Sequence, residues 1–69
     1  MLIKDLGKAL KERRKSLGIN QVALAEIAGI SANTLYKIER GQTNATFEVL
    51  EKILSVLGLE LKLEIRKVG

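Results

Sequence analysis

The chain has 69 residues and contains no cysteine and no histidine. This excludes a disulfide framework and the usual zinc sites, and a core this small buries only about 60% of the surface that the unfolded chain exposes. The formal net charge is +4, with a pI near 9.7. Such a charge is compatible with a nucleic-acid partner and also with an ordinary solvated surface, and self-association is the remaining support for so small a domain.

The residue inventory also argues against catalysis and against a membrane span. With no His, no Cys and Asp5 as the only aspartate, the common acid–base, nucleophilic and metal-binding constellations cannot be assembled. No apolar run approaches 20 residues, and Lys4, Asp5 and Lys8 interrupt the apolar N-terminal stretch. We therefore expect a cytoplasmic protein that is not an enzyme, uses no cofactor or metal and does not enter a membrane.

A first helix is predicted from residue 3 to residue 17. Apolar side chains recur there at helical spacing, at Ile3, Leu6, Leu10 and Leu17. Gly18 follows as a C-terminal stop. Residues 4–15 hold six basic and two acidic side chains, whereas the rest of the chain is close to neutral. The positive charge of the chain is therefore concentrated in this helix.

Two short helices are predicted next, joined by a link of a few residues. Asn20 can cap a helix that ends at Gly29, and Ser31 can cap the helix after it, which ends before Gly41. Leu35 and Ile38 form the inward side of that helix. The side chains expected to face outward are Ala32, Asn33, Thr34, Tyr36, Lys37 and Arg40. The short link forces the two helices to cross steeply.

A fourth helix is predicted from its cap at Thr46 to Leu57, closed by Gly58. The stripe expected to face the core is Phe47, Leu50, Leu54 and Leu57. A second apolar set consists of Val49, Ile53 and Val56. A surface helix normally carries one apolar stripe, so the second set indicates a second partner. A core helix covered on all sides is the alternative, but so short a chain has little protein to cover it.

Strict alternation of apolar and charged residues follows Gly58. Leu59, Leu61, Leu63 and Ile65 alternate with Glu60, Lys62, Glu64 and Arg66. A period of two predicts a half-buried β-strand, and a lone strand leaves its backbone groups unpaired. We therefore expect it to pair antiparallel with the same strand of a second copy and to cover the second apolar set of the fourth helix. A disordered tail is the alternative.

The two short helices carry a recognisable motif. Residues 21–38 read QVALAEIAGISANTLYKI and are followed at once by Glu39, Arg40 and Gly41. This segment resembles the helix-turn-helix family of phage repressor and Cro proteins, the XRE family, and the resemblance covers roughly residues 3–57. Ala25 is small enough for the helices to approach, and Gly29 accepts the positive φ angle of the tight turn. Apolar side chains fill the space between the helices at Ile30, Leu35 and Ile38.

The resemblance implies that the third helix enters the DNA major groove while the second lies across the phosphate backbone. The base-reading residues would then be Ala32, Asn33, Thr34, Tyr36 and Lys37. Asn33 can pair bidentately with adenine and Lys37 can donate to guanine. Ala32 can contact a thymine methyl group, at a position where relatives often have glutamine.

The same resemblance implies contacts with the DNA backbone. Gln21 matches the glutamine with which the family binds a phosphate at the start of the second helix. The phosphate-binding residues would be Asn20, Gln21, Arg40, Gln42 and Asn44. Arg14 and Glu39 match a family pair whose salt bridge braces the first helix against the third, so both are expected to be structural.

The C-terminal run from Leu57 to Leu63, LGLELKL, resembles the end of HipB-type antitoxins. In those proteins the C-terminal strands pair across the dimer, and the dimer represses its own operon and binds a partner toxin kinase. The resemblance therefore implies a homodimer. A stand-alone repressor and an antitoxin differ only in partner, and the chain does not separate them.

The sequence thus predicts a mainly α, repressor-like helix-turn-helix domain of four to five helices over residues 1–58, with one C-terminal β-strand over residues 59–69 that belongs to the same domain and pairs across a dimer. The expected function is sequence-specific binding of a palindromic double-stranded DNA operator by a dimer that represses its own operon. The resemblance to HipB-type proteins adds the antitoxin of a toxin–antitoxin pair as an expected role. The expected dimer interface is Val49, Ile53, Val56, Leu59, Leu61, Leu63 and Ile65. The alternative is a module that binds a partner protein, and this would favour an apolar outer face on the third helix, which is polar.

Overall fold

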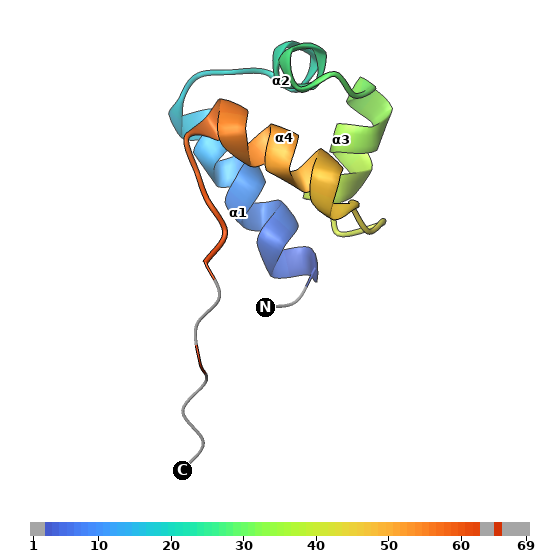
Figure 1. The fold of residues 1–69 in the computed structure, drawn as a ribbon. Coiled ribbons are helices and arrows are strands. Elements are labelled where there is room, and N and C mark those ends of the chain that lie inside the picture. The colour runs from blue at the N-terminus through green and yellow to red at the C-terminus, as the bar shows by residue number, and fades with distance from the viewer. Residues whose placement is uncertain (1–2, 63–64, 66–69) are drawn as a thin grey trace.

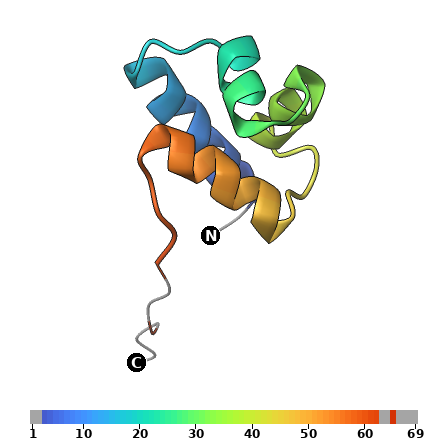
Figure 2. The ribbon, with the colours of Figure 1, turned by 45° about the horizontal axis from the view of Figure 1, so that its top comes forward.

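The computed structural model describes residues 3–62 and 65, and this part of the chain forms four α-helices. They are α1 (Ile3–Ser16), α2 (Gln21–Ala28), α3 (Ala32–Glu39) and α4 (Phe47–Leu57). α1 and α4 lie against each other, and α2 and α3 lie together on one side of that pair (Figure 1 and Figure 2). Within the described residues no helix is both long and apolar enough to cross a membrane. The predicted mainly α fold is confirmed.

The starts of α2, α3 and α4 follow the predicted capping residues. Each cap accepts a hydrogen bond from the backbone N–H three residues later: Asn20 from Ala23 at 2.8 Å, Ser31 from Thr34 at 3.0 Å and Thr46 from Val49 at 3.1 Å. These bonds satisfy N–H groups that have no partner within the helix. Gly29 ends α2 with a φ of 73°, a left-handed conformation that glycine adopts without steric cost. The tight turn between α2 and α3 is therefore built as predicted.

A single apolar core receives side chains from all four helices. Its members are Leu10 of α1; Leu24, Ala25 and Ala28 of α2; Leu35 and Ile38 of α3; and Leu50, Ile53, Leu54 and Leu57 of α4. Interiors of proteins are close-packed, so a small residue at a helix crossing determines how near two helices can come. Ala25, 2% exposed, has this role in α2. The core fixes α2 and α3 relative to each other and to α1 and α4.

The inward stripe of α4 differs from the predicted one. Phe47 is 70% exposed, whereas Ile53 is fully buried at 0%. The stripe is Leu50, Ile53, Leu54 and Leu57, which follows the spacing of a single helix face. Phe47 is the first residue of α4 and precedes the turn that packs on the core. The expectation of an inward Phe47 was wrong, and so was that of Ile53 in an interface, because Ile53 lies inside this chain.

The remaining predicted interface residues fall on two parts of the chain. Val49 and Val56 are half-buried at the edge of the core. Leu59, Leu61 and Ile65 are exposed, and no strand is formed among residues 59–62 and at 65. Leu63 lies outside the described residues. The predicted strand is not confirmed, because its hydrogen-bonding partner was expected to come from a second copy.

α1 and α3 approach each other closely at Gly7. A Cβ atom at this position would overlap the carbonyl oxygen of Ile38 and lie 2.8 Å from the carbonyl oxygen of Glu39. Only a residue without a side chain fits against backbone atoms at such distances. The contact places the end of α3 directly on the backbone of α1.

Candidate nucleic-acid interface

The outer face of α3 is polar and open to solvent. Its exposed side chains are those of Asn33, Tyr36 and Lys37. Ala32 is half-buried and packs on the core, and Thr34 is half-buried with its Oγ1 atom 2.7 Å from the capping hydroxyl of Ser31. Of the five residues predicted to read bases, three are therefore freely presented, and two lie at the start of α3 with part of their surface covered.

Tyr36 and Arg40 form a pair on this face. The guanidinium carbon of Arg40 lies 5.3 Å from the centroid of the Tyr36 ring. This distance is within the range of a cation–π interaction, which stabilises a cation over the face of an aromatic ring. Residues four apart share one face of a helix, so the pair could have been predicted from the sequence spacing of Tyr36 and Arg40. The structure links a predicted base-reading residue to a predicted phosphate-binding one.

The start of α2 carries the next two predicted residues. Asn20 is exposed, and its Oδ1 atom is used as the helix cap. Gln21 is half-buried, and its Nε2 atom donates a hydrogen bond to Oε1 of Glu39 at 3.0 Å. The first residue of α2 is therefore tied to the last residue of α3, a link that sequence reasoning missed.

Arg14 and Glu39 form a buried ion pair between α1 and α3. Nε of Arg14 donates to Oε2 of Glu39 at 2.8 Å, and Nη2 donates to Oε1 at 3.0 Å. Nη1 donates to the carbonyl oxygen of Ile19 at 2.9 Å, and the two charged side chains are 9% and 1% exposed. The hydrogen bond with Glu39 raises the pKa of the Arg14 guanidinium, while burial acts in the opposite direction. The pair has the geometry that was predicted for a structural brace.

The loop between α3 and α4 carries Gln42 and Asn44, the last two predicted phosphate-binding residues. Both side chains are exposed. The backbone N–H of Gln42 donates to the carbonyl oxygen of Lys37 at 2.9 Å, which holds the start of this loop against the end of α3.

Two basic side chains of α1, Arg13 and Arg14, bind groups of other helices. Nε of Arg13 donates to the carbonyl oxygen of Leu57 at 2.9 Å, and Leu57 is the last residue of α4. The last carbonyl groups of a helix lack intrahelical partners and favour a cation. Arg13 and Arg14 therefore make structural contacts, and Lys8, Lys11 and Lys15 are, like Arg13, exposed on α1. The role of Arg13 was not predicted.

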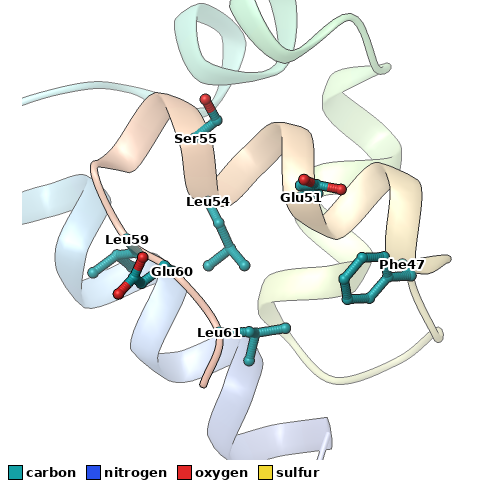
Figure 3. A pocket seen from close by; sticks show the side chains of 7 residues that line it. All are labelled: Phe47, Glu51, Leu54, Ser55, Leu59, Glu60 and Leu61. Atoms are coloured by element: carbon teal, nitrogen blue, oxygen red, sulfur yellow. The ribbon is translucent and has the colours of Figure 1, made fainter. Parts of the chain in front are cut away.

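A groove with a mixed apolar and polar lining lies along α4. The chain turns back after α4, so that Leu59 and Leu61 lie beside Leu54 and Phe47 (Figure 3). The polar residues of its lining are Glu51, Ser55 and Glu60. The exposed face of Phe47 thus contributes to the same surface as the C-terminal leucines.

Two capped helices joined by a glycine turn, the second with a polar outer face, define a helix-turn-helix protein, a class built to bind duplex DNA rather than to catalyse a reaction. Residues 10–63 match the model of the family HTH_3, described as Helix-turn-helix. The chain belongs to this family. The predicted family and the predicted repressor-like fold are confirmed.

Individual relatives show the same class. The chain is 39% identical over 57 residues to the HTH-type transcriptional regulator SinR of Bacillus subtilis, a match that covers 81% of this chain and 51% of SinR. It is similar in structure to the restriction-modification controller protein C.AhdI from Aeromonas hydrophila, with a TM-score of 0.81, 29% identity and coverage of 84% of this chain and 88% of that one.

The clp gene regulator ClgR from C. glutamicum is a second similar structure, with a TM-score of 0.83 and 31% identity, covering 88% of this chain and 78% of that one. The curated relatives are in general longer than the matched region. The chain spans 19% of the length of the related regulator from Methanocaldococcus jannaschii, 17% of that from Methanococcus vannielii and 57% of that from Haemophilus influenzae.

Proposed function

We propose that this protein is a sequence-specific DNA-binding transcriptional regulator that acts as a homodimer on a palindromic operator. The observation that carries the proposal is the exposed polar face of α3, with Asn33, Tyr36 and Lys37 on the second helix of a helix-turn-helix. An α-helix fits the major groove of B-form DNA, where every base pair presents a distinct set of hydrogen-bonding groups. The related regulators support the same assignment.

The five predicted base-reading residues of α3 have proposed roles in the groove. Asn33 pairs with adenine through its amide, and Lys37 donates to the acceptor atoms of guanine. Ala32 and Thr34, at the start of α3, offer methyl groups to thymine. Tyr36 contributes its ring beside them. The half-buried state of Ala32 and Thr34 limits their contact to bases that come close to the N-terminal end of α3.

The proposed phosphate contacts gather near the other end of α3. The bond between Gln21 and Glu39 brings the start of α2 next to the end of α3, where Arg40 follows. Gln42 and Asn44 continue from Arg40 along an exposed loop. Phosphate contacts fix the register of a protein on DNA, while base contacts determine its sequence preference. Asn20 completes this set at the cap of α2.

The proposed dimer interface includes the groove of α4. Phe47, Leu59 and Leu61 are exposed large apolar side chains on one surface, and such a patch indicates an interaction site. Val49, Val56, Leu63 and Ile65 remain from the predicted interface, while Ile53 is removed because it is buried in the core. A second copy would also give the segment after residue 58 the antiparallel partner that a strand requires.

We further propose that the dimer represses its own operon and is located in the cytoplasm. No feature of residues 3–62 and 65 favours a toxin over a second copy, and a second copy is the proposed partner.

The test is a selection of preferred duplexes from a random DNA library, followed by fluorescence anisotropy with the selected duplex and a scrambled one across a salt series. We expect tight, selective binding by a dimer with a steep negative salt dependence. Half-sites about 34–36 Å apart are expected from two copies of α3. Weak binding of equal strength to both duplexes would contradict the proposal.

Lys37→Ala tests the base-reading role directly. Preference at one base pair of each half-site should relax by about 1–3 kcal/mol, while affinity for the scrambled duplex changes little. Lys52→Ala is the matched control, because Lys52 is an exposed lysine of α4 that pairs only loosely with Glu48, at 3.8 Å. A uniform loss of affinity in Lys37→Ala, without any change in preference, would show that Lys37 contacts the backbone instead.

A further inference from the structure

The start of α2 and the end of α3 are joined through side chains as well as through packing. Gln21 is the first residue of α2 and Glu39 the last residue of α3. Their bond, from Nε2 to Oε1, is 3.0 Å long, and the Glu39 side chain is 1% exposed. A residue proposed to contact DNA is therefore held by a carboxylate that is itself inaccessible to solvent and to DNA.

The carboxylate determines which end of the Gln21 amide turns towards it. An ionised carboxylate only accepts hydrogen bonds, so the amide nitrogen, and not the amide oxygen, faces Glu39. Arg14 holds the carboxylate in turn, through 2.8 Å and 3.0 Å bonds to its two oxygens. Rotation of the carboxylate would break this two-point contact between buried charges, which is costly. The orientation of the Gln21 amide is thus set before any ligand arrives.

This orientation matters for an anionic ligand. The amide nitrogen carries two N–H groups, and the bond to Glu39 uses one of them, which leaves the other for a phosphate oxygen. Gln21 is half-buried, so part of its side chain is accessible at the N-terminal end of α2. The backbone N–H groups in the first turn of a helix also favour an anion there. A side chain that is already ordered loses less freedom on binding.

We propose that Glu39 is a positioning residue for DNA binding, which orients the amide of Gln21 so that it donates to a backbone phosphate. The inference rests on the proposed function, because it requires that Gln21 contact DNA. In this proposal, the hydrogen bond between Gln21 and Glu39 couples the phosphate contact of α2 to the base contacts of α3. A shift of α3 relative to α2 would therefore weaken both kinds of contact together.

The test is a mutant cycle on the selected operator duplex. Four proteins are compared: the parent, Gln21→Ala, the pair Arg14→Met with Glu39→Met, and the triple variant. The methionine pair removes the carboxylate without leaving a buried unpaired charge. In the parent, Gln21→Ala should weaken binding about tenfold for every sequence, as expected for the loss of a charge-assisted hydrogen bond. In the methionine background the same change should cost less than about threefold.

A phosphate-specific readout accompanies the affinities. Duplexes in which single phosphates are replaced by neutral methylphosphonates locate the phosphate that Gln21 contacts. The methionine pair should lose the effect of substitution at that phosphate and keep the effects at the others. Gln42→Ala, on the exposed loop after α3, is the control, because its cost should be the same in both backgrounds.

The possible outcomes separate the two proposals. A Gln21→Ala variant with parental affinity would overturn the phosphate contact, which belongs to the proposed function, and the role of Glu39 with it. An equal cost of Gln21→Ala in both backgrounds would overturn the role of Glu39 alone, because a merely structural Glu39 weakens binding without altering what Gln21 contributes.

The shape-conserving variant Glu39→Gln provides a second measurement in case the methionine pair does not fold. NMR relaxation of the Gln21 side-chain NH₂ group in the free protein should report an ordered amide in the parent and a more mobile one in Glu39→Gln. Equal mobility in the two proteins would contradict the proposal.

Discussion

Replacing Gly7 with alanine adds one methyl group at the point where α1 meets the end of α3. In an exposed helix the same change is favourable by about 0.5–1 kcal/mol, because glycine loses more backbone freedom on folding than alanine. Here the new Cβ atom would overlap the carbonyl oxygen of Ile38 and lie 2.8 Å from that of Glu39. Both are backbone atoms, which cannot turn aside as a flexible side chain can.

The expected result is a net loss of stability. Overpacking in a close-packed interior costs about 1–3 kcal/mol, and this exceeds the helix-propensity gain. For a domain of this size, 1 kcal/mol corresponds to a change of about 4–8 °C in Tm. Thermal and urea unfolding followed by circular dichroism, at one fixed protein concentration because a dimer makes Tm concentration-dependent, measure the loss.

Ala9→Gly is the matched control, because Ala9 is exposed on the same helix and loses only its propensity contribution. We expect it to be destabilised by no more than about 1 kcal/mol. A Gly7→Ala protein as stable as the parent, or more stable, would refute the close approach of α1 and α3.

Three further predictions concern the buried ion pair, the Tyr36–Arg40 pair and the groove of α4. Glu39→Ala should cost about 3–5 kcal/mol in urea unfolding because it leaves Arg14 buried without its partner, whereas methionine at both positions should cost far less. Tyr36→Leu should weaken operator binding by about 0.5–1 kcal/mol because the guanidinium over its ring loses its support, while Tyr36→Phe should not. Leu61→Asp should yield monomers in analytical ultracentrifugation, whereas Val22→Asp, exposed on α2, should leave the dimer intact; monomers in both cases would argue against the groove of α4 as the interface.

The helix boundaries could be predicted because their signals are local. A capping residue acts on a backbone N–H three positions away, and Asn20, Ser31 and Thr46 all do so. The turn at Gly29 is equally local, since it depends on the φ angle of one residue. The outer face of α3 followed from the inward positions of Leu35 and Ile38, which leave the other side chains towards solvent.

The inward face of α4 was predicted correctly at Leu50, Leu54 and Leu57 but not at its fourth residue. Phe47 and Ile53 are both at helical spacing from these leucines, and the core contains Ile53. Helical spacing does not decide the choice between them, since the end of a helix can extend beyond the core that covers its middle. The packing of α1 and α2 against α4 decides it.

The contacts that support the candidate site also escaped prediction where they join distant parts of the chain. Gln21 and Glu39 are 18 residues apart, and Arg13 and Leu57 are 44 residues apart. No periodic pattern links such positions. Arg14 and Glu39 could be paired only through the family resemblance. The strand after residue 58 depends on a partner outside the chain, so an alternating pattern alone cannot establish it.

The hydrogen bond from Arg13 to the end of α4 has a consequence for the spacing of operator half-sites. It fixes the end of α4 to α1 at Leu57, one residue before Gly58. In the proposed dimer, the segment that follows this point forms part of the interface that connects one copy of α3 to the other. If this point is rigid, the distance between the two copies of α3 is fixed. Arg13→Ala should therefore broaden the range of half-site spacings that the protein binds without altering the bases that it prefers.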